Sequence, residues 1–245
     1  MRLLACAFSF LTRLPVAPGS LFDGKTVARS ARWFPLVGAV LGAMEAGALW
    51  VLAPRLPAAA AAVSVVALDA ALTGAMHLDG LADTADGFGG GRSREDVLRI
   101  MRDHAIGSYG AVAVVLALAL KIATIAALAG SVRAIYALVL APALGRWTAV
   151  LLGATQPYAR PSEDNGTGSP TRWIGRTELA VATVIAGGAA AACGLRGAAA
   201  WLLTAIVANL WGRHSARRIG GVTGDTLGVA VMAAECLTLL VFTAA

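Results

Sequence analysis

Three aspartates lie close together in the first half of the chain, at positions 79, 83 and 86, and a cluster of glycines follows them. On a helix, spacings of four and three residues place Asp79, Asp83 and Asp86 on one face, within roughly 60° of one another. Like charges on one face repel, and a divalent cation between them would remove that repulsion. Hard carboxylate oxygens beside an apolar run suit Mg²⁺ that carries a phosphate substrate. The alternative is a solvated helix end that stops at the glycines.

A second polar segment follows, over residues 92–104. Ser93 with Asp96 three residues later is typical of a helix start. Asp103 ends this predicted helix and is a candidate for a fourth carboxylate at the metal, or for a general base. Arg102 is a candidate for pairing with substrate phosphate. The alternative is an interfacial amphipathic helix stabilised by its own salt bridges.

A glycine-rich segment precedes an aspartate near the C-terminus. Gly220, Gly221 and Gly224 lead into Asp225 at the mouth of the last apolar run. Glycine-rich backbone at a helix N-terminus is suited to anion binding. We therefore expect Gly221 to contact substrate phosphate and Asp225 to hold a metal or a ribose hydroxyl.

The helices that would position these residues can be predicted from the apolar composition of the chain. Of the 245 residues, 58% are hydrophobic and 14% are charged, and the mean hydropathy is +0.73. Soluble domains have about 25% charged residues, so this chain is predicted to be a polytopic membrane protein. Its three cysteines are odd in number and widely separated, which argues against a disulfide or metal framework.

The apolar residues form seven segments of near-spanning length, which predicts an all-α bundle of about seven transmembrane helices. The segments are 33–53, 57–76, 109–129, 133–153, 178–196, 198–211 and 226–244. Residues 3–14, like residues 92–104, are expected to form an interfacial amphipathic helix. We expect residues 1–245 to be one integral-membrane domain, with six or eight spans as the alternatives near residues 178–211.

If the chain crosses the membrane seven times, its basic residues are distributed unevenly between the two sides of the membrane. Fifteen of the twenty fall on the side of the N-terminus, whereas the other side holds Arg55, Arg133 and Arg196. The positive-inside rule makes the N-terminal side cytoplasmic. The aspartate cluster and the segment before Asp225 then face cytosolic substrates. This asymmetry also explains the net charge of +6 without a nucleic-acid partner.

Charged residues inside predicted spans are costly and point to function. These residues are Glu45, Asp69, Lys121, Arg146 and Glu235. Lys121 and Asp69 are candidates for a mutual ion pair. Arg146 is placed in the cytoplasmic half of its span, from where it is expected to reach the phosphate site.

These motifs, in this order, resemble the adenosylcobinamide-GDP ribazoletransferase family, also called cobalamin synthases, over essentially the whole chain. The resemblance rests on His77-x-Asp79-Gly80-Leu81-x-Asp83-Thr84-x-Asp86-Gly87, Ile100-Met101-x-Asp103, Gly107-x-Tyr109-Gly110 and Gly220-Gly221-x-Thr223-Gly224-Asp225-x-x-Gly228. It extends to Phe10-Leu11-Thr12-Arg13-Leu14-Pro15, Phe34-Pro35-Leu36-x-Gly38, Gly145-Arg146-Trp147 and Tyr158-Ala159-Arg160.

The resemblance implies an Mg²⁺-dependent enzyme of the inner cell membrane. Such an enzyme joins adenosylcobinamide-GDP to α-ribazole, or to α-ribazole 5′-phosphate, and releases GMP. The metal ligands would be Asp79, Asp83 and Asp86, and the catalytic residues Asp83 and Asp103. The substrate-binding residues would be Arg102, Arg146, Arg160, Arg217, Gly221 and Asp225. Besides the substrates, the expected partners are membrane lipid, a second copy of the chain and other enzymes of cobalamin synthesis.

Two other classes of membrane protein compete with this interpretation. A CDP-alcohol phosphotransferase also uses spaced aspartates at the cytoplasmic face, but its signature requires an Ala-Arg pair soon after Asp-Gly. Here Leu81-Ala82-Asp83 follows Asp79-Gly80, and the next arginine is Arg92. An ion-coupled carrier would explain the charges inside the spans, but the sequence shows no repeated halves.

Overall fold

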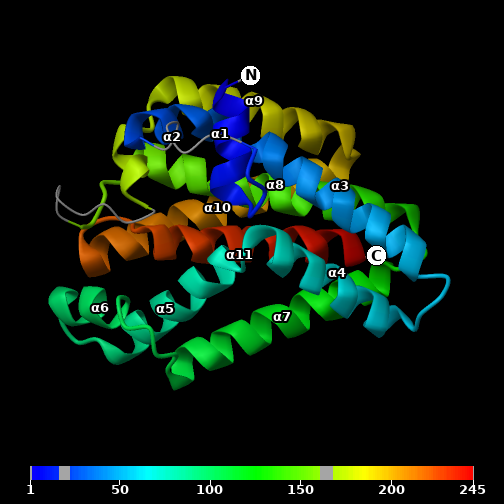
Figure 1. The fold of residues 1–245 in the computed structure, drawn as a ribbon, viewed down its shortest axis with the longest axis horizontal. Helices are drawn as coiled ribbons and strands as arrows, with labels where there is room; N and C mark the ends of the chain where they lie inside the picture. Colours follow the sequence, from blue (N-terminus) through cyan, green and yellow to red (C-terminus); the bar gives the residue numbers. More distant parts are fainter. Residues whose placement is uncertain (1, 17–22, 161–167, 245) are drawn as a thin grey trace.

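The computed structural model of the chain is a bundle of helices, most of which run along the long axis of the molecule (Figure 1). It describes residues 2–16, 23–160 and 168–244. The α-helices are α1 (Arg2–Leu11), α2 (Gly24–Ser30), α3 (Phe34–Leu52), α4 (Ala58–Thr73), α5 (Met76–Gly90), α6 (Arg94–Ile100), α7 (Ser108–Leu128), α8 (Val132–Thr155), α9 (Arg176–Ala192), α10 (Gly194–Ile219) and α11 (Gly224–Thr243). The 3₁₀ helices are η2 (Ala31–Trp33) and η3 (Ser169–Trp173). The predicted all-α class is confirmed.

Five helical segments in the described chain are long and apolar enough to cross a membrane: α2–α3 taken together, α7, α8, α10 and α11. Helices α4 and α5 pass the same test only as a pair, bent by 90°, which raises the count to six. The predicted segment 178–196 corresponds to α9, which has only 17 residues. A multi-pass membrane protein is therefore confirmed, whereas the count of seven spans is not.

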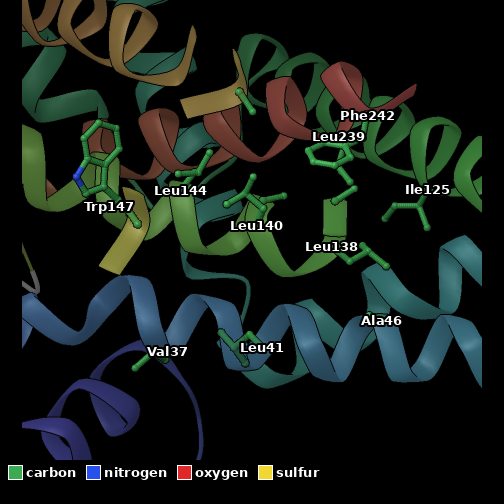
Figure 2. Close-up of a cluster of buried hydrophobic side chains, with 14 of the residues drawn as sticks. Val37, Leu41, Ala46, Ile125, Leu138, Leu140, Leu144, Trp147, Leu239 and Phe242 are labelled. Atoms are coloured by element: carbon green, nitrogen blue, oxygen red, sulfur yellow. The ribbon is translucent and has the colours of Figure 1, made fainter. Parts of the chain in front are cut away.

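Helix α8 forms the centre of the bundle, between α3 and α11. Figure 2 shows Leu138, Leu140, Leu144 and Trp147 of α8 packed among side chains of the neighbouring helices. The four side chains are at most 4% exposed, so this helix contacts protein rather than lipid over most of its surface. Tight apolar packing of this kind fixes the positions of the polar groups that α8 and α11 carry.

Two glycines let α3 approach α8 closely. A methyl group at Gly38 would collide with the carbonyl oxygen of Pro142, and one at Gly42 with the carbonyl oxygen of Leu138. Because Pro142 has no N–H, the Leu138 carbonyl lacks its usual helical partner, and the Gly42 backbone packs directly against it. The spacing Gly38-x-x-x-Gly42 thus marks a helix contact, as small residues do in membrane bundles.

The bend between α4 and α5 is built from two left-handed residues. Gly74 has φ = 67° and Ala75 has φ = 59°, and Ala75 is the one non-glycine residue with positive φ in the described chain. The amide of Arg13, just after α1, donates to the Leu72 carbonyl at 2.8 Å and ties the N-terminal segment to the bend. The bend redirects α5, so that its aspartates lie beside α11 and α7 rather than in line with α4.

The start of α6 is capped as the sequence predicts. The Asp96 amide donates to Ser93 Oγ at 3.1 Å, and the Ser93 amide donates to Asp96 Oδ2 at 3.4 Å. Hydrogen bonds from the Ser93 side chain and backbone lower the pKa of Asp96 below its usual range. Helices α1 and α6 are short, as expected for segments that do not cross the membrane.

Candidate active site

The first turn of α11 packs against α5 and brings the two aspartate motifs together. A methyl group on Gly80 would lie 2.9 Å from both the Cα atom and the carbonyl oxygen of Asp225. One on Gly228 would lie 3.0 Å from the carbonyl oxygen of His77. Side chains do not normally tolerate such distances, so glycine permits this crossing. The sequence separates Asp79 from Asp225 widely, and the fold makes them neighbours.

Asp83 has several other acidic side chains in its neighbourhood. Asp79, Asp86 and Asp225 are all near enough to act on it electrostatically, and Arg160 is the nearby cation. No hydrogen bond from the described residues reaches the carboxylates of Asp79 and Asp83. Both therefore offer oxygen lone pairs for a ligand, and their mutual repulsion favours a cation.

Arg160 balances part of this negative charge. Its Nη2 atom lies 2.9 Å from Asp225 Oδ2, and Thr223 Oγ1 donates to the same oxygen at 3.3 Å. The segment before Arg160 is fixed to the segment before α11, because the Ala159 amide donates to the Val222 carbonyl at 2.8 Å. The structure thus brings two of the predicted substrate-binding residues, Arg160 and Asp225, into direct contact.

Gly221 belongs to the same connection. A methyl group here would collide with the carbonyl oxygen of Pro157, whose partner is the Val222 amide at 2.8 Å. The glycine therefore allows two backbone segments to pair closely. Its predicted contact with phosphate stays a prediction.

Asp86 supports the start of α7. Its Oδ2 atom accepts the Gly107 amide at 2.7 Å, and its Oδ1 atom accepts the Gly110 amide at 2.9 Å. Amide groups in the first helical turn have no partner within the helix, and a carboxylate satisfies them and complements the helix dipole. The carboxylate of Asp86 thus has a structural role that Asp79 and Asp83 lack, and its predicted role as a metal ligand stays a prediction.

Three predicted site residues are not brought into this group. Asp103 is exposed, and its Oδ1 atom accepts the nearby Ala105 amide at 3.1 Å. The amides of Gly107 and Gly110, which follow Asp103 closely in the sequence, donate to Asp86 instead. The predicted roles of Asp103 as metal ligand or general base stay predictions. Arg102 and Arg217 are exposed on α6–α7 and α10, and their predicted phosphate contacts stay predictions.

A buried ion network adjoins the site. Lys121 Nζ lies 3.0 Å from Asp69 Oδ2 and 2.6 Å from Glu235 Oε2, which confirms the Lys121–Asp69 pair. Arg146 binds the other oxygen of Glu235, and its Nη2 atom lies 4.0 Å from Asp69 Oδ1. Two cations thus face two carboxylates, while Glu45 lies nearby and is 2% exposed. The partner that Glu235 provides for both cations was not apparent from the sequence.

A cavity joins the aspartate group to the ion network. Its volume is about 110 Å³, and its polar lining includes His77, Asp79, Arg146 and Asp225. The rest of the lining is mainly apolar and comes from α1, α2, η2, α3, α5, η3, α8 and α11. His77 lines the same cavity as Asp79, although helical spacing predicts that it faces away from the aspartates.

Two arginines outside the predicted site hold its frame together. Arg94 donates to the carbonyl oxygens of Ile219 and Ala159, each at 2.7 Å. Arg218 binds the Gly91 carbonyl, across from α10 to the end of α5. Arg218 is one of the fifteen basic residues on the N-terminal side, and no local sequence signal indicates a carbonyl partner more than a hundred residues away.

The oxygen donors of the site are compatible with Mg²⁺. No cluster of three His, Cys, Asp or Glu side chains is assembled for a metal among the described residues. Mg²⁺ usually keeps several waters and needs only one or two carboxylates together with substrate phosphates. Asp79 and Asp83, on one helix face and without hydrogen-bond donors, meet that modest requirement.

Comparison with known proteins gives a consistent result over the whole chain. Residues 3–243 match the family model described as cobalamin-5-phosphate synthase. A relative from Ralstonia nicotianae, named adenosylcobinamide-GDP ribazoletransferase, is 42% identical over 99% of this chain and 95% of its own. Proteins of the same name from Ralstonia pickettii and Shewanella frigidimarina are 39% and 37% identical, over 95% and 100% of this chain and 91% and 95% of theirs. No solved structure gives a significant match.

Proposed function

This chain belongs to the cobalamin-5-phosphate synthase family, and we propose that it joins adenosylcobinamide-GDP to α-ribazole, or to α-ribazole 5′-phosphate, with release of GMP. Two relatives that carry the ribazoletransferase name match 99% and 95% of this chain, and the family model matches residues 3–243, which include every segment that forms the site. One structural observation supports this activity. Asp79 and Asp83 of α5 lie near Asp225 and its partner Arg160, and a cavity adjoins them.

The proposed reaction is an in-line displacement at phosphorus. A ribose hydroxyl of the ribazole attacks the phosphorus on the cobinamide side, a new P–O bond forms, and the bond to GMP breaks. Such a transfer depends mainly on positioning and charge neutralisation. Asp225 is suited to orient the attacking hydroxyl and to accept its proton at Oδ1, because Arg160 and Thr223 hold Oδ2. The predicted base Asp103 has only a local contact in the described chain.

We further propose that Asp79 and Asp83 hold Mg²⁺. When bound there, the ion would neutralise charge on the pyrophosphate oxygens of the substrate. Asp86 keeps these two residues in place, because it anchors the end of α5 to the start of α7. Asp83 is proposed to act both as a metal ligand and as a catalytic residue, the two roles that the resemblance to the family implies for it.

Arginines are proposed to bind the phosphate groups. Arg160 lies at the site itself, next to Asp225, and is the arginine proposed for this role. Arg146 lies in the cavity wall and pairs with Glu235, and its predicted phosphate contact stays a prediction. Arg102 and Arg217 are exposed and would attract the anionic substrate from solution rather than hold it. We propose that this end of the molecule faces the cytoplasm from the inner membrane, because most basic residues fall on that side. Association with a second copy or with other pathway enzymes stays a prediction.

The test is GMP release by purified protein in detergent. We expect GMP only when adenosylcobinamide-GDP, a ribazole substrate and Mg²⁺ are all present, together with an equal amount of cobalamin product. A carrier would release no GMP, and a CDP-alcohol phosphotransferase would release CMP from a CDP-alcohol. Folded protein that turns over none of the proposed substrates would contradict the proposal.

A further inference from the structure

Most of the residues that line the cavity are apolar, and two of them are aromatic. Phe10 and Phe34, on α1 and α3, stack with ring centroids 5.7 Å apart and planes 11° apart. Ala149 of α8 and Val231 of α11 lie in the same lining. The volume of about 110 Å³ is large enough for several water-sized groups, and so for a small aromatic ring system. Asp79 and Asp225 belong to the same lining.

We propose that this cavity binds the benzimidazole base of α-ribazole, an inference that rests on the proposed function. The base is flat, carries two methyl groups and has one free ring nitrogen, so an apolar wall with aromatic side chains suits it. Its ribose would then extend toward Asp225. The phosphate-bearing substrate would approach the aspartates from the side of Arg160.

The lining argues against the guanine of the other substrate. Guanine has donors and acceptors along most of its edge, and each one left unpaired on burial is costly. The lining is mainly apolar, and its few polar residues include the two aspartates assigned to the ribose and the metal. By contrast, the free nitrogen of the benzimidazole needs only one donor. Arg146 supplies it, because Arg146 lines the cavity, is 1% exposed, and its Nε atom has no hydrogen-bond partner in the described chain.

The cavity can be filled without changing a charged group. Ala149→Leu extends a side chain from α8 into the cavity, whereas Ala154→Leu adds the same atoms to a half-buried position of α8 outside the lining. Binding of labelled α-ribazole is measured by equilibrium dialysis on protein in detergent with Mg²⁺. We expect Ala149→Leu to weaken binding about tenfold or more and Ala154→Leu to leave it unchanged.

A second variant and a competition experiment complete the test. Phe10→Leu keeps the apolar surface but removes a ring, and we expect a several-fold loss of α-ribazole affinity. Free dimethylbenzimidazole should displace labelled α-ribazole, whereas guanosine should not. Unchanged affinity in both cavity variants, or displacement by guanosine alone, overturns the assignment.

Failure of this assignment differs from failure of the proposed function. Wild-type protein that releases GMP from both substrates, with variants that bind α-ribazole normally, rejects the cavity as the base site and leaves the activity intact. Wild-type protein that neither binds α-ribazole nor releases GMP rejects both.

Discussion

The aspartates of α5 share a helix face but not a chemical environment. Asp79 and Asp83 receive no hydrogen bonds from the described residues, whereas each oxygen of Asp86 accepts a backbone amide. Hydrogen bonds to a carboxylate stabilise its charge and use its lone pairs. The residues free to bind a substrate-linked cation are therefore Asp79 and Asp83, and Asp86 secures the helix that carries them.

At the residue scale, Gly80 controls how closely Asp225 approaches α5. Gly80→Ala would force the first turn of α11 away, because the added methyl would lie 2.9 Å from the Asp225 backbone. We expect GMP release to fall at least tenfold. Gly47→Ala is the matched control on α3, since a Cβ there meets nothing within 4 Å. It should leave activity unchanged and stabilise the helix by roughly 0.5–1 kcal/mol. Equal activity of the two variants would contradict the proposed role of the crossing.

Residue types and spacing predict part of the site. The aspartates of α5, Asp225 and the Lys121–Asp69 pair all appear where their chemistry suggests. The partner of Asp86 does not, because an amide 21 residues away at the start of another helix leaves no local pattern. Ion pairs such as Arg146–Glu235 likewise depend on tertiary packing rather than on sequence spacing.

At the element scale, the start of α7 depends on a side chain of α5. Asp86→Ala would leave two amides of the first turn without a partner, at Gly107 and Gly110. We expect a loss of about 1–2 kcal/mol in the free energy of unfolding, as for removal of a helix cap. Denaturant unfolding in detergent measures it. The control Asp103→Ala, at an exposed position, should change stability by less than about 0.5 kcal/mol.

The buried ion network joins α4, α7, α8 and α11. Lys121→Met would leave Asp69 without its 3.0 Å partner and Glu235 without its 2.6 Å partner. Removing one member of a buried pair costs about 3–5 kcal/mol. The double variant Lys121→Met/Asp69→Asn should recover part of that loss. A double variant no more stable than Lys121→Met would show that the pair is not coupled.

Hydropathy predicts where most of the helices lie, but it does not predict the break between α4 and α5. The segment 57–76 reads as one apolar run, and a single glycine within such a run is compatible with an unbroken helix. The left-handed conformation at Ala75 arises only in the fold, where α5 packs against α11 and α7. The short length of α9 likewise leaves the number of spans open to experiment.

At the scale of the whole molecule, the direction of successive helices predicts the side of each loop. In a cysteine-free background, we expect an impermeant maleimide to label Pro54→Cys and Ala244→Cys in spheroplasts. Ala105→Cys, between α6 and α7, should react only after permeabilisation. All three positions are exposed. Labelling of Ala244→Cys only after permeabilisation would favour an even number of spans.

The whole molecule combines a rigid core around α8 with a polar site at the end of the bundle where α5, α11 and the Arg160 segment meet. We propose above all that Asp83 acts with Mg²⁺ on a phosphate substrate. The direct test is the rate of GMP release against Mg²⁺ concentration for wild type, Asp83→Asn and the control Asp96→Asn, at a half-buried position of α6. We predict that Asp83→Asn loses about 10²–10³ in turnover and requires more Mg²⁺, as when a charge-stabilising group is removed. Asp96→Asn should match the wild type. An Asp83→Asn protein with wild-type turnover and Mg²⁺ dependence would contradict the account.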